Sequence, residues 1–186
     1  MESILEEEKK IIDSYLEEAL PRKFDRRWLD SALGEARWEH DIESYTKAIA
    51  EPGWELLGRG GKRWRPFLML MSYRAVSGRN DSVGSILALP ELIHNGTLII
   101  DDIEDSSSIR RGKRCVHKIF GDDIAINAGN SLYYLPCLLI ARSRGLSHKV
   151  KVRLYETVME EMVKLSLGQG TDIYWHRSKK SGMNEG

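Results

Sequence analysis

Residues 92–111 constrain this chain more than any other stretch, because an apolar, helix-length segment runs without a break into a cluster of charge. The charged residues are Asp101, Asp102, Glu104, Asp105, Arg110 and Arg111. In a helix, Asp101 and Asp105 lie one turn apart on one face, about 6 Å along the axis, with His94 and Thr97 on the same stripe. The clustered acids repel one another, so we expect a positive charge between them. Mg²⁺ bound by one or two carboxylates and by substrate phosphates satisfies that need.

The same cluster has a second interpretation, as the solvated face or end of an ordinary helix. We do not expect a calcium-binding EF-hand loop, because the sequence lacks the alternating ligands, the central glycine and the final glutamate of that loop. The choice between a metal site and a solvated helix end therefore depends on the rest of the chain.

Composition is that of an ordinary soluble protein. The chain has 186 residues, enough for one domain with a real core, and its 28 basic residues balance its 28 acidic ones. That balance argues against a strongly basic surface, so we expect no nucleic-acid partner. The acidic start is unlike a targeting peptide, and no run reaches the roughly 18 apolar residues of a membrane span. Cys115 and Cys137 are expected as free thiols, although a disulfide stays open, and we expect a cytoplasmic location.

Hydrophobic periodicity predicts helices throughout the chain. We expect them over residues 3–19, 26–50, 66–77, 85–100, 124–141 and 149–167, with turns at Pro52–Gly53, Gly78, Ser106–Ser108, Gly121 and Gly168. Asp122 and Asp123 are expected to cap the next helix rather than bind a metal, and Pro136 to bend it. The sequence shows no alternating strand pattern and no repeat. The predicted fold class is therefore all-α, a bundle of long helices joined by short loops.

Two short basic segments accompany the acidic cluster. Residues 58–66 form a glycine-rich loop, in which Lys62, Arg63 and Arg65 offer donors for phosphate oxygens just before a helix begins near Pro66. The loop lacks the spacing of a P-loop, and a charged surface turn is the alternative. Residues 110–114, Arg-Arg-Gly-Lys-Arg, open a second basic loop directly after the acids.

Together these segments have the chemistry of a diphosphate site. Lys62 and Arg65 supply one set of positive charges, Arg110 and Arg111 supply another, and Asp172 adds a further carboxylate. Carboxylates between such cations can hold metal ions, which screen a leaving diphosphate while the fixed cations bind a second anionic substrate. The apolar helix above the acids would line a dry channel for a hydrocarbon tail.

At these positions the sequence resembles the trans-isoprenyl diphosphate synthases, the polyprenyl synthetase family. The matching segments are His94, Gly-Gly-Lys-Arg-Trp-Arg-Pro at 60–66, Asp-Asp-Ile-Glu-Asp at 101–105, Arg-Arg-Gly at 110–112 and Gly-Gln-Gly-Thr-Asp at 168–172. Their order and spacing agree with the family across residues 60–175, and the motifs are most similar to those of geranylgeranyl diphosphate synthases. The resemblance implies a helical bundle of the isoprenoid synthase type, which this chain would hold only in part.

The resemblance also implies roles for single residues. Catalysis would depend on Asp101, Asp102 and Asp105, and Mg²⁺ would be bound by Asp101, Asp105 and Asp172, with Asp102 supporting them. The allylic diphosphate would be bound by Arg110 and Gln169, and isopentenyl diphosphate by Lys62, Arg65, His94 and Arg111. The implied reaction is prenyl transfer, in which the allylic substrate loses its diphosphate, the isopentenyl double bond attacks the resulting cation, and a proton is lost. This chemistry needs metal ions as Lewis acids and no protein nucleophile.

Product length is expected to depend on residues beneath the first aspartate. By the same resemblance, bulky side chains four and five residues before Asp101 stop chain growth early, and those residues are Thr97 and Gly96. Small side chains leave room for a product longer than farnesyl diphosphate, with geranylgeranyl diphosphate the first choice. A partner's helix or deeper residues can also set the limit, and Gly96 has a second interpretation as a site of close helix packing.

The sequence departs from the family's pattern after the first half of that pattern. The family's Lys-Thr pair, second aspartate-rich motif and later lysine have no counterpart in these residues. We therefore expect a fragment or split half that needs a C-terminal complement, or else a non-catalytic regulatory subunit of a heteromeric synthase. A terpene cyclase or squalene-type synthase is a further alternative, although those enzymes lack the Gly-Gly-Lys-Arg loop.

The expected assembly is a homodimer, or a heteromer with a chain that carries the second motif. Within one isoprenyl synthase domain, residues 1–57 would form N-terminal helices, residues 58–175 the substrate and metal site, and residues 176–186 a polar tail.

Overall fold

The computed structural model of this chain describes residues 2–79 and 83–178. It divides into two compact units, Met1–Ser143 and Arg144–Gly186. The first unit contains, in chain order, α1 (Glu2–Ala19), α2 (Arg26–Leu33), α3 (Ile42–Tyr45), the π-helix η1 (Thr46–Ala50), α4 (Glu51–Leu57), α5 (Trp64–Ser77), the 3₁₀-helix η2 (Gly84–Ala88), α6 (Leu89–Glu104), β1 (Ile109–Arg110), β2 (Lys113–Arg114), α7 (Val116–Phe120) and α8 (Asp122–Arg142). The second contains α9 (His148–Ser178). Within the described residues, the strands are limited to the two-residue pair β1 and β2, and the predicted all-α class is confirmed.

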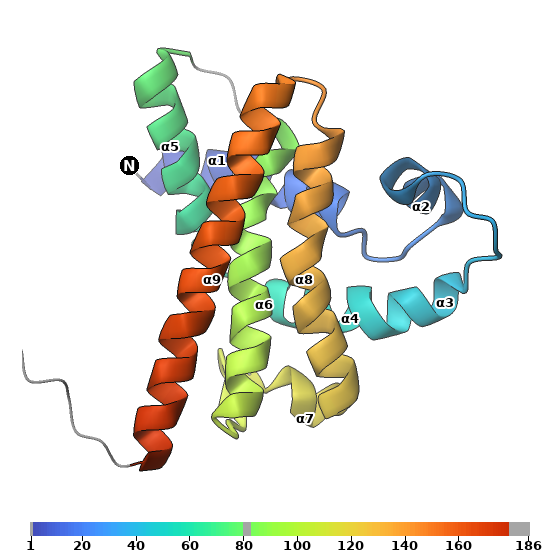
Figure 1. Ribbon diagram of the computed structural model, residues 1–186, viewed down its shortest axis with the longest axis vertical. Helices are drawn as coiled ribbons and strands as arrows, with labels where there is room; N and C mark the ends of the chain where they lie inside the picture. Colours follow the sequence, from blue (N-terminus) through green and yellow to red (C-terminus); the bar gives the residue numbers. More distant parts are fainter. Residues whose placement is uncertain (1, 80–82, 179–186) are drawn as a thin grey trace, which may run out of the picture. The chain divides into compact units, whose positions relative to one another are not determined.

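Helices α6 and α8 lie side by side at the centre of the first unit (Figure 1). Their close approach depends on two glycines. A Cβ atom on Gly96 would lie 2.8 Å from the carbonyl oxygen of Gly129, and a Cβ atom on Gly129 would lie 2.9 Å from Ile100 Cδ1. Leu132, which also faces Gly96, is fully buried. Close helix packing, the second interpretation of Gly96, is therefore what its contacts show.

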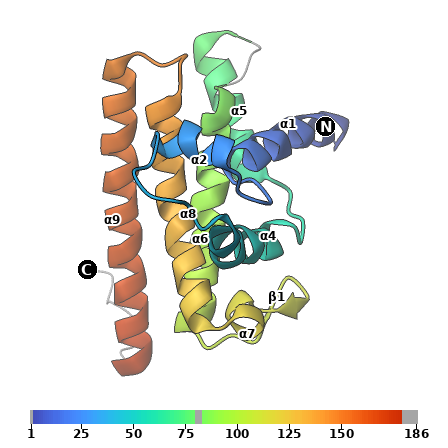
Figure 2. The ribbon, with the colours of Figure 1, turned by 90° about the vertical axis from the view of Figure 1, so that its right-hand side faces the viewer.

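The elements that carry the basic segments surround α6. Helix α5 packs beside α6 near its N-terminal end, whereas the β1–β2 hairpin and α7 lie at its C-terminal end (Figure 2). Helix α4 contacts both α6 and α7. The loop that follows α4 and the hairpin that follows α6 are thereby brought to the same side of α6.

The chain from Ile42 to Leu57 is one uninterrupted helical path, which corrects the predicted turn at Pro52–Gly53. Helix α3 leads into η1 and then into α4 without a gap. Pro52 has no N–H to donate to the carbonyl four residues earlier, and the wider π turn leaves room for its ring. That carbonyl, Ala48 O, accepts instead from the Asn127 side-chain amide of α8 at 3.4 Å.

The predicted helix over residues 26–50 is wrong in its middle, because residues 34–41 form a loop between α2 and α3. Gly34 ends α2 with a φ of 88°, a conformation that favours glycine. At the other end of the loop, the Asp41 carboxylate accepts the N–H of Ser44 and starts α3. Apolar spacing alone did not reveal these two end signals.

Two other predicted helix ends are confirmed. Gly78 closes α5 in the left-handed conformation, with a φ of 67°, and Pro90 lies in the first turn of α6. The predicted capping of α8 by Asp122 and Asp123 is wrong, because Gly121 is the N-cap and receives no side-chain cap bond; both aspartates lie in the first turn, where the Asp123 carboxylate accepts the N–H of Ile124 at 2.9 Å. Pro136 lies inside α8.

Among the described residues, α8 alone is long and apolar enough to cross a membrane by length and composition. The core helix of a soluble protein meets the same criterion, and α8 packs against α1, α4, α6 and α7 in the first unit. The feature is therefore only a weak sign of a membrane-spanning segment.

In the second unit, α9 runs on to Ser178 and corrects the predicted helix end at Leu167. Gly168 and Gly170 lie inside this helix, where an added Cβ atom would meet nothing within 4 Å. Each glycine costs a helix about 1 kcal/mol relative to alanine, which a long helix tolerates when its other residues continue the hydrogen-bond ladder. The predicted polar tail begins inside α9, and residues 179–186 lie outside the described part of the chain.

Candidate active site

The acidic cluster lies where α6 ends. Ser106 takes the left-handed position after the helix, with a φ of 54°, and its N–H donates to Ile103 O at 3.0 Å. The N–H of Ser107 donates to Asp102 O at 2.9 Å, which completes a Schellman-type helix end. This end turns the chain from the acids directly into the β1–β2 hairpin, and so brings Arg110 back beside them.

Arg110 supplies a positive charge next to Asp101 and Asp102, the first two acids of the cluster. Its Nη2 atom lies 2.6 Å from Asp102 Oδ1 and 3.1 Å from Asp101 Oδ2, and its Nε donates to Asp102 Oδ1 at 2.8 Å. The hydrogen bond to Asp102 raises the pKa of Arg110. The Asp102 side chain is 1% exposed, whereas that of Asp101 is 32% exposed. Asp102 is thus a buried anchor for Arg110, and its supporting role in catalysis stays a prediction.

The remaining carboxylates fit a hard divalent cation by their chemistry. Asp101 is partly exposed and Asp105 is exposed, one turn apart at the end of α6, and their oxygens are the donors that Mg²⁺ prefers. Within residues 2–79 and 83–178, no group of three or more His, Cys, Asp or Glu side chains is arranged to hold a metal ion. One or two carboxylates are nevertheless what Mg²⁺ commonly takes from a protein, because substrate phosphates and waters complete its shell.

His94 lies among positive charges from both basic segments. Burial lowers the pKa of His94 below its ordinary value of 6.5, and the charges of Arg65, Arg111 and Arg110 lower it further against the opposing charge of Glu91. His94 is therefore neutral at pH 7. Three of the residues predicted to bind isopentenyl diphosphate, His94, Arg65 and Arg111, thus share one electrostatic neighbourhood.

Lys62 and Arg65 stand on either side of the start of α5. Lys62 is exposed on the loop before the helix. The Arg65 guanidinium lies over the ring of Trp64, 4.6 Å from its centroid, and Trp64 is half exposed. Stacking of this kind favours an extended, ordered arginine at the protein surface.

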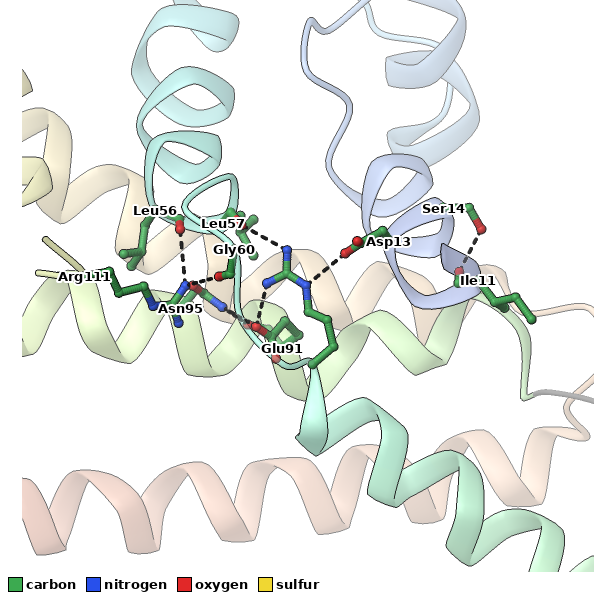
Figure 3. A network of polar contacts seen from close by, with 10 residues as sticks. Ile11, Asp13, Ser14, Leu56, Leu57, Gly60, Glu91, Asn95 and Arg111 are labelled. Atoms are coloured by element: carbon green, nitrogen blue, oxygen red, sulfur yellow. Dashed lines mark hydrogen bonds and ion pairs between the residues drawn. The ribbon is translucent and has the colours of Figure 1, made fainter. Parts of the chain in front are cut away.

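Arg63 is a structural residue, which corrects its prediction as a phosphate donor. Its side chain is 4% exposed and donates to Asp13 Oδ1, Glu91 Oε1 and Leu57 O, each at 2.9 Å. Asn95 Nδ2 adds a further donor to Glu91 Oε1 at 3.1 Å, and Figure 3 shows how Asp13, Leu57, Glu91 and Asn95 converge. A ligand would meet a guanidinium that is buried and already paired.

Arg111 faces the end of α4 (Figure 3). Its Nη1 donates to Gly60 O at 2.9 Å and to Leu56 O at 3.3 Å. Burial lowers the pKa of Arg111, although an arginine stays charged in a protein. Sequence reasoning missed Arg59, which follows α4 and donates to backbone carbonyls of the β1–β2 hairpin. The available signal was the spacing of four residues between Glu55 and Arg59, which is typical of an acid–base pair on one helix face.

Comparison with known proteins assigns these motifs to a family. The model of the polyprenyl synthetase family matches residues 46–185. The chain belongs to the polyprenyl synthetase family. The predicted resemblance is therefore confirmed.

Relatives of this member of the polyprenyl synthetase family are diphosphate synthases by name. The chain is 35% identical over 127 residues to the geranylfarnesyl diphosphate synthase of Aeropyrum pernix, and the aligned segment covers 66% of this chain and 40% of that protein. It is 31% identical over 145 residues to the geranylgeranyl pyrophosphate synthase of Eremothecium gossypii, and this aligned segment covers 77% of this chain and 44% of that protein. The solved geranylgeranyl pyrophosphate synthetase from Pyrococcus horikoshii Ot3 matches with a TM-score of 0.78 at 30% identity, over 98% of this chain and 48% of that one. The chain spans less than half the length of these relatives.

The two residues that were predicted to set product length, Gly96 and Thr97, have different surroundings. Gly96 faces α8, whereas Thr97 is partly buried and its hydroxyl donates to the carbonyl three residues earlier at 2.7 Å. Tyr133 of α8, which sequence reasoning did not single out, has its Cε1 atom 3.0 Å from the position of a Cβ on Gly96. Burial, and then the charges of Glu104 and Asp101, raise the pKa of Tyr133 to about 12. Tyr133 thus belongs, with Leu132 and Gly129, to the part of α8 that packs against Gly96.

Gln169 and Asp172 belong to the second unit. They lie three residues apart on α9, hence on one helix face, with Asp172 exposed and Gln169 partly exposed. Asp172 as a metal ligand and Gln169 as a diphosphate donor stay predictions.

Proposed function

We propose that this polyprenyl synthetase acts in prenyl transfer from an allylic diphosphate to isopentenyl diphosphate. The observation that carries the proposal is that the two basic segments are joined, with Arg111 Nη1 donating to Gly60 O at 2.9 Å, while Arg110 pairs with Asp101 and Asp102 at the end of α6. Such an arrangement offers separate cations for two diphosphate groups and acids for a divalent metal. The names of the relatives support the same reaction class.

The side chains of this chain would bind and orient the two substrates. Isopentenyl diphosphate would be bound by cations from both basic segments, with neutral His94 as a hydrogen-bond donor; those cations are Lys62, Arg65 and Arg111. The allylic diphosphate would be bound by Arg110, whose guanidinium Asp102 holds in place, and by Gln169. Arginine suits both roles because its planar fork matches phosphate oxygens.

The proposed metal ligands are Asp101, Asp105 and Asp172. When bound, Mg²⁺ would neutralise charge on the departing diphosphate. In the transfer, the bond between the allylic carbon and the diphosphate oxygen breaks, and the isopentenyl double bond forms a new carbon–carbon bond to that carbon. The positive charge then lies on the isopentenyl unit, where loss of a proton from the carbon next to the cation forms the new double bond. The chain itself would bind, orient and position the reactants without becoming covalently attached.

We propose a product longer than farnesyl diphosphate, with geranylgeranyl diphosphate the first choice. Thr97 lies one turn before Asp101 and is small, which leaves room beneath the acids. Relatives named for geranylgeranyl and geranylfarnesyl products support this length. Because α8 closes off Gly96, Thr97 is the position at which we expect a larger side chain, such as in Thr97→Phe, to shorten the product.

We propose that turnover also uses the region that corresponds to the remaining length of the relatives, whether in the same polypeptide or in a partner. The proposed assembly is a homodimer, or a heteromer with a chain that carries a second aspartate-rich motif. The support is that the relatives named as synthases are more than twice as long as the segment that this chain matches.

Titration calorimetry of the full chain with farnesyl diphosphate, with and without Mg²⁺, tests the proposed function. We expect binding that requires Mg²⁺ and is lost when Asp101→Ala and Asp105→Ala are combined. Asp122→Ala, at an exposed acid in the first turn of α8, is the control and should bind as the wild type does. Binding that ignores both the metal and the paired substitution contradicts the proposal. A wild-type chain that binds no allylic diphosphate would favour the regulatory subunit instead.

A further inference from the structure

Arg59 reaches from the end of α4 to the backbone of the β1–β2 hairpin. Its Nη1 donates to Arg110 O at 2.8 Å, and its Nη2 donates to Arg114 O at 2.7 Å. The Arg59 side chain is 1% exposed. A buried guanidinium is costly unless its N–H groups are paired, so these two bonds help to make this position tolerable for Arg59.

Glu55, one turn earlier on α4, fixes the same guanidinium from the other side. Arg59 Nη2 lies 3.1 Å from Glu55 Oε1, and Arg59 Nε donates to Glu55 O at 3.0 Å. Because the guanidinium carries several N–H donors in one plane, it can pair with Glu55 of α4 and at the same time donate to two carbonyls of the hairpin. The pair therefore behaves as a clamp, which we call the Glu55–Arg59 clamp.

Arg111 makes the reverse connection. It belongs to the turn of the hairpin, and its Nη1 donates to Gly60 O and Leu56 O at the end of α4. The loop after α4 and the hairpin after α6 are thus joined by two arginines that point in opposite directions. Each arginine satisfies backbone carbonyls of the other segment.

We propose that Arg59 is a positioning residue that holds the hairpin against the loop after α4, so that the cations of both segments keep a fixed spacing. The cations in question are Lys62 and Arg65 on the loop, and Arg110 and Arg111 on the hairpin. This inference rests on the proposed function, because that function makes the four side chains diphosphate ligands. Arg59 is not among the proposed diphosphate ligands: it acts through the backbone of Arg110 and the placement of Arg111.

Hydrogen exchange of the full chain, followed by mass spectrometry, reports on the hairpin directly. We expect Arg59→Gln to speed exchange in residues 108–115 by about fivefold, the factor that corresponds to one net hydrogen bond. The N–H of Cys115, which donates to Ser108 O at 2.9 Å, is the clearest probe. Exchange in α6 and α8 should stay at the wild-type rate. Arg59→Lys keeps the charge without the fork and should give an intermediate rate.

Arg26→Gln is the matched control. It removes an arginine from another pair four residues apart on a helix, with Asp30 at 3.6 Å, but the Arg26 side chain is 60% exposed. Hairpin exchange that is no faster in Arg59→Gln than in Arg26→Gln would overturn the proposal. An equal increase in every helix would overturn it too, because Arg59 would then be a general stabiliser and not a positioning residue.

Titration calorimetry with isopentenyl diphosphate tests the consequence for binding. We expect Arg59→Gln to weaken binding by about fivefold, and to weaken it no further when Arg111→Ala is already present, because the residue that Arg59 positions is then gone. Fully additive losses would overturn the proposal. If the wild-type chain binds no isopentenyl diphosphate, the proposed function fails, and hydrogen exchange still decides whether Arg59 holds the hairpin.

Discussion

Replacing Gly96 by alanine measures how tightly α6 packs against α8. The new methyl group would lie 2.8 Å from the backbone oxygen of Gly129 and 3.0 Å from Leu132 Cβ. Overpacking costs about 1–3 kcal/mol, and a backbone atom that cannot rotate away places this site in the upper half of that range. Alanine offsets about 1 kcal/mol of the cost through its higher helix propensity. We therefore expect the free energy of unfolding to fall by about 1–2 kcal/mol.

Urea unfolding followed by far-ultraviolet circular dichroism measures this loss. Gly129→Ala is the matched control, because its methyl group would meet Ile100 Cδ1 at 2.9 Å, the far end of a side chain that can change rotamer, and its backbone contact, Gly96 O at 3.3 Å, is looser than the 2.8 Å contact of Gly96→Ala. Its loss should be smaller than that of Gly96→Ala. A Gly96→Ala variant as stable as the wild type, or more stable than Gly129→Ala, would refute the reasoning and reopen a chain-length role for Gly96.

Three further predictions separate structural from functional residues. Folding lowers the pKa of His94 below 6.5, so the unfolded chain takes up a proton that the folded chain resists. The free energy of unfolding should therefore be intact above pH 6.5 and fall as the pH drops below it. In urea titrations, His94→Gln should show a smaller change of this free energy with pH than the wild type. Arg63→Ala should lower the free energy of unfolding by about 3–5 kcal/mol, because Glu91 stays buried without its ionic partner. Lys62→Ala should weaken isopentenyl diphosphate binding and leave the free energy of unfolding nearly unchanged. Equal stabilities of the two variants would contradict this. Ser106→Gly should raise stability by about 0.5–1 kcal/mol in calorimetry, because glycine takes a φ of 54° without strain, and a loss would contradict the Schellman-type end.

Local periodicity predicted the helices that bury one face, and it failed where a distant contact decides. Pro52 looked like a helix breaker because the chain alone does not show that Asn127 supplies a donor to the carbonyl that proline leaves open. The loop after Gly34 was missed for the opposite reason, since apolar residues continued at helical spacing beyond it. Both errors arise because a helix end depends on which backbone groups find partners, and hydrophobicity does not report those partners.

The basic loop shows the same limit for function. Its three cations are chemically alike in the sequence, yet Arg63 is buried among partners 50 and 28 residues away, Asp13 and Glu91, while Lys62 is exposed and Arg65 lies on Trp64. The sequence could therefore predict a phosphate-binding loop from its glycines and cations. It could not predict which cation the folded chain would use for its own ion pairs.

Asp101 and Asp102 are neighbours with opposite environments, and this difference could be partly foreseen. Consecutive residues on a helix point about 100° apart, so Asp102 had to leave the face shared by Asp101 and Asp105. What the sequence did not show is that the turn at Ser106 returns Arg110 to the side on which Asp102 lies. The buried carboxylate of Asp102 therefore holds the arginine most closely, whereas Asp101, which also lies 3.1 Å from Arg110, and the exposed Asp105 are the two acids of α6 that we propose as metal ligands. The assignment of roles among three adjacent acids thus depends on how the helix ends.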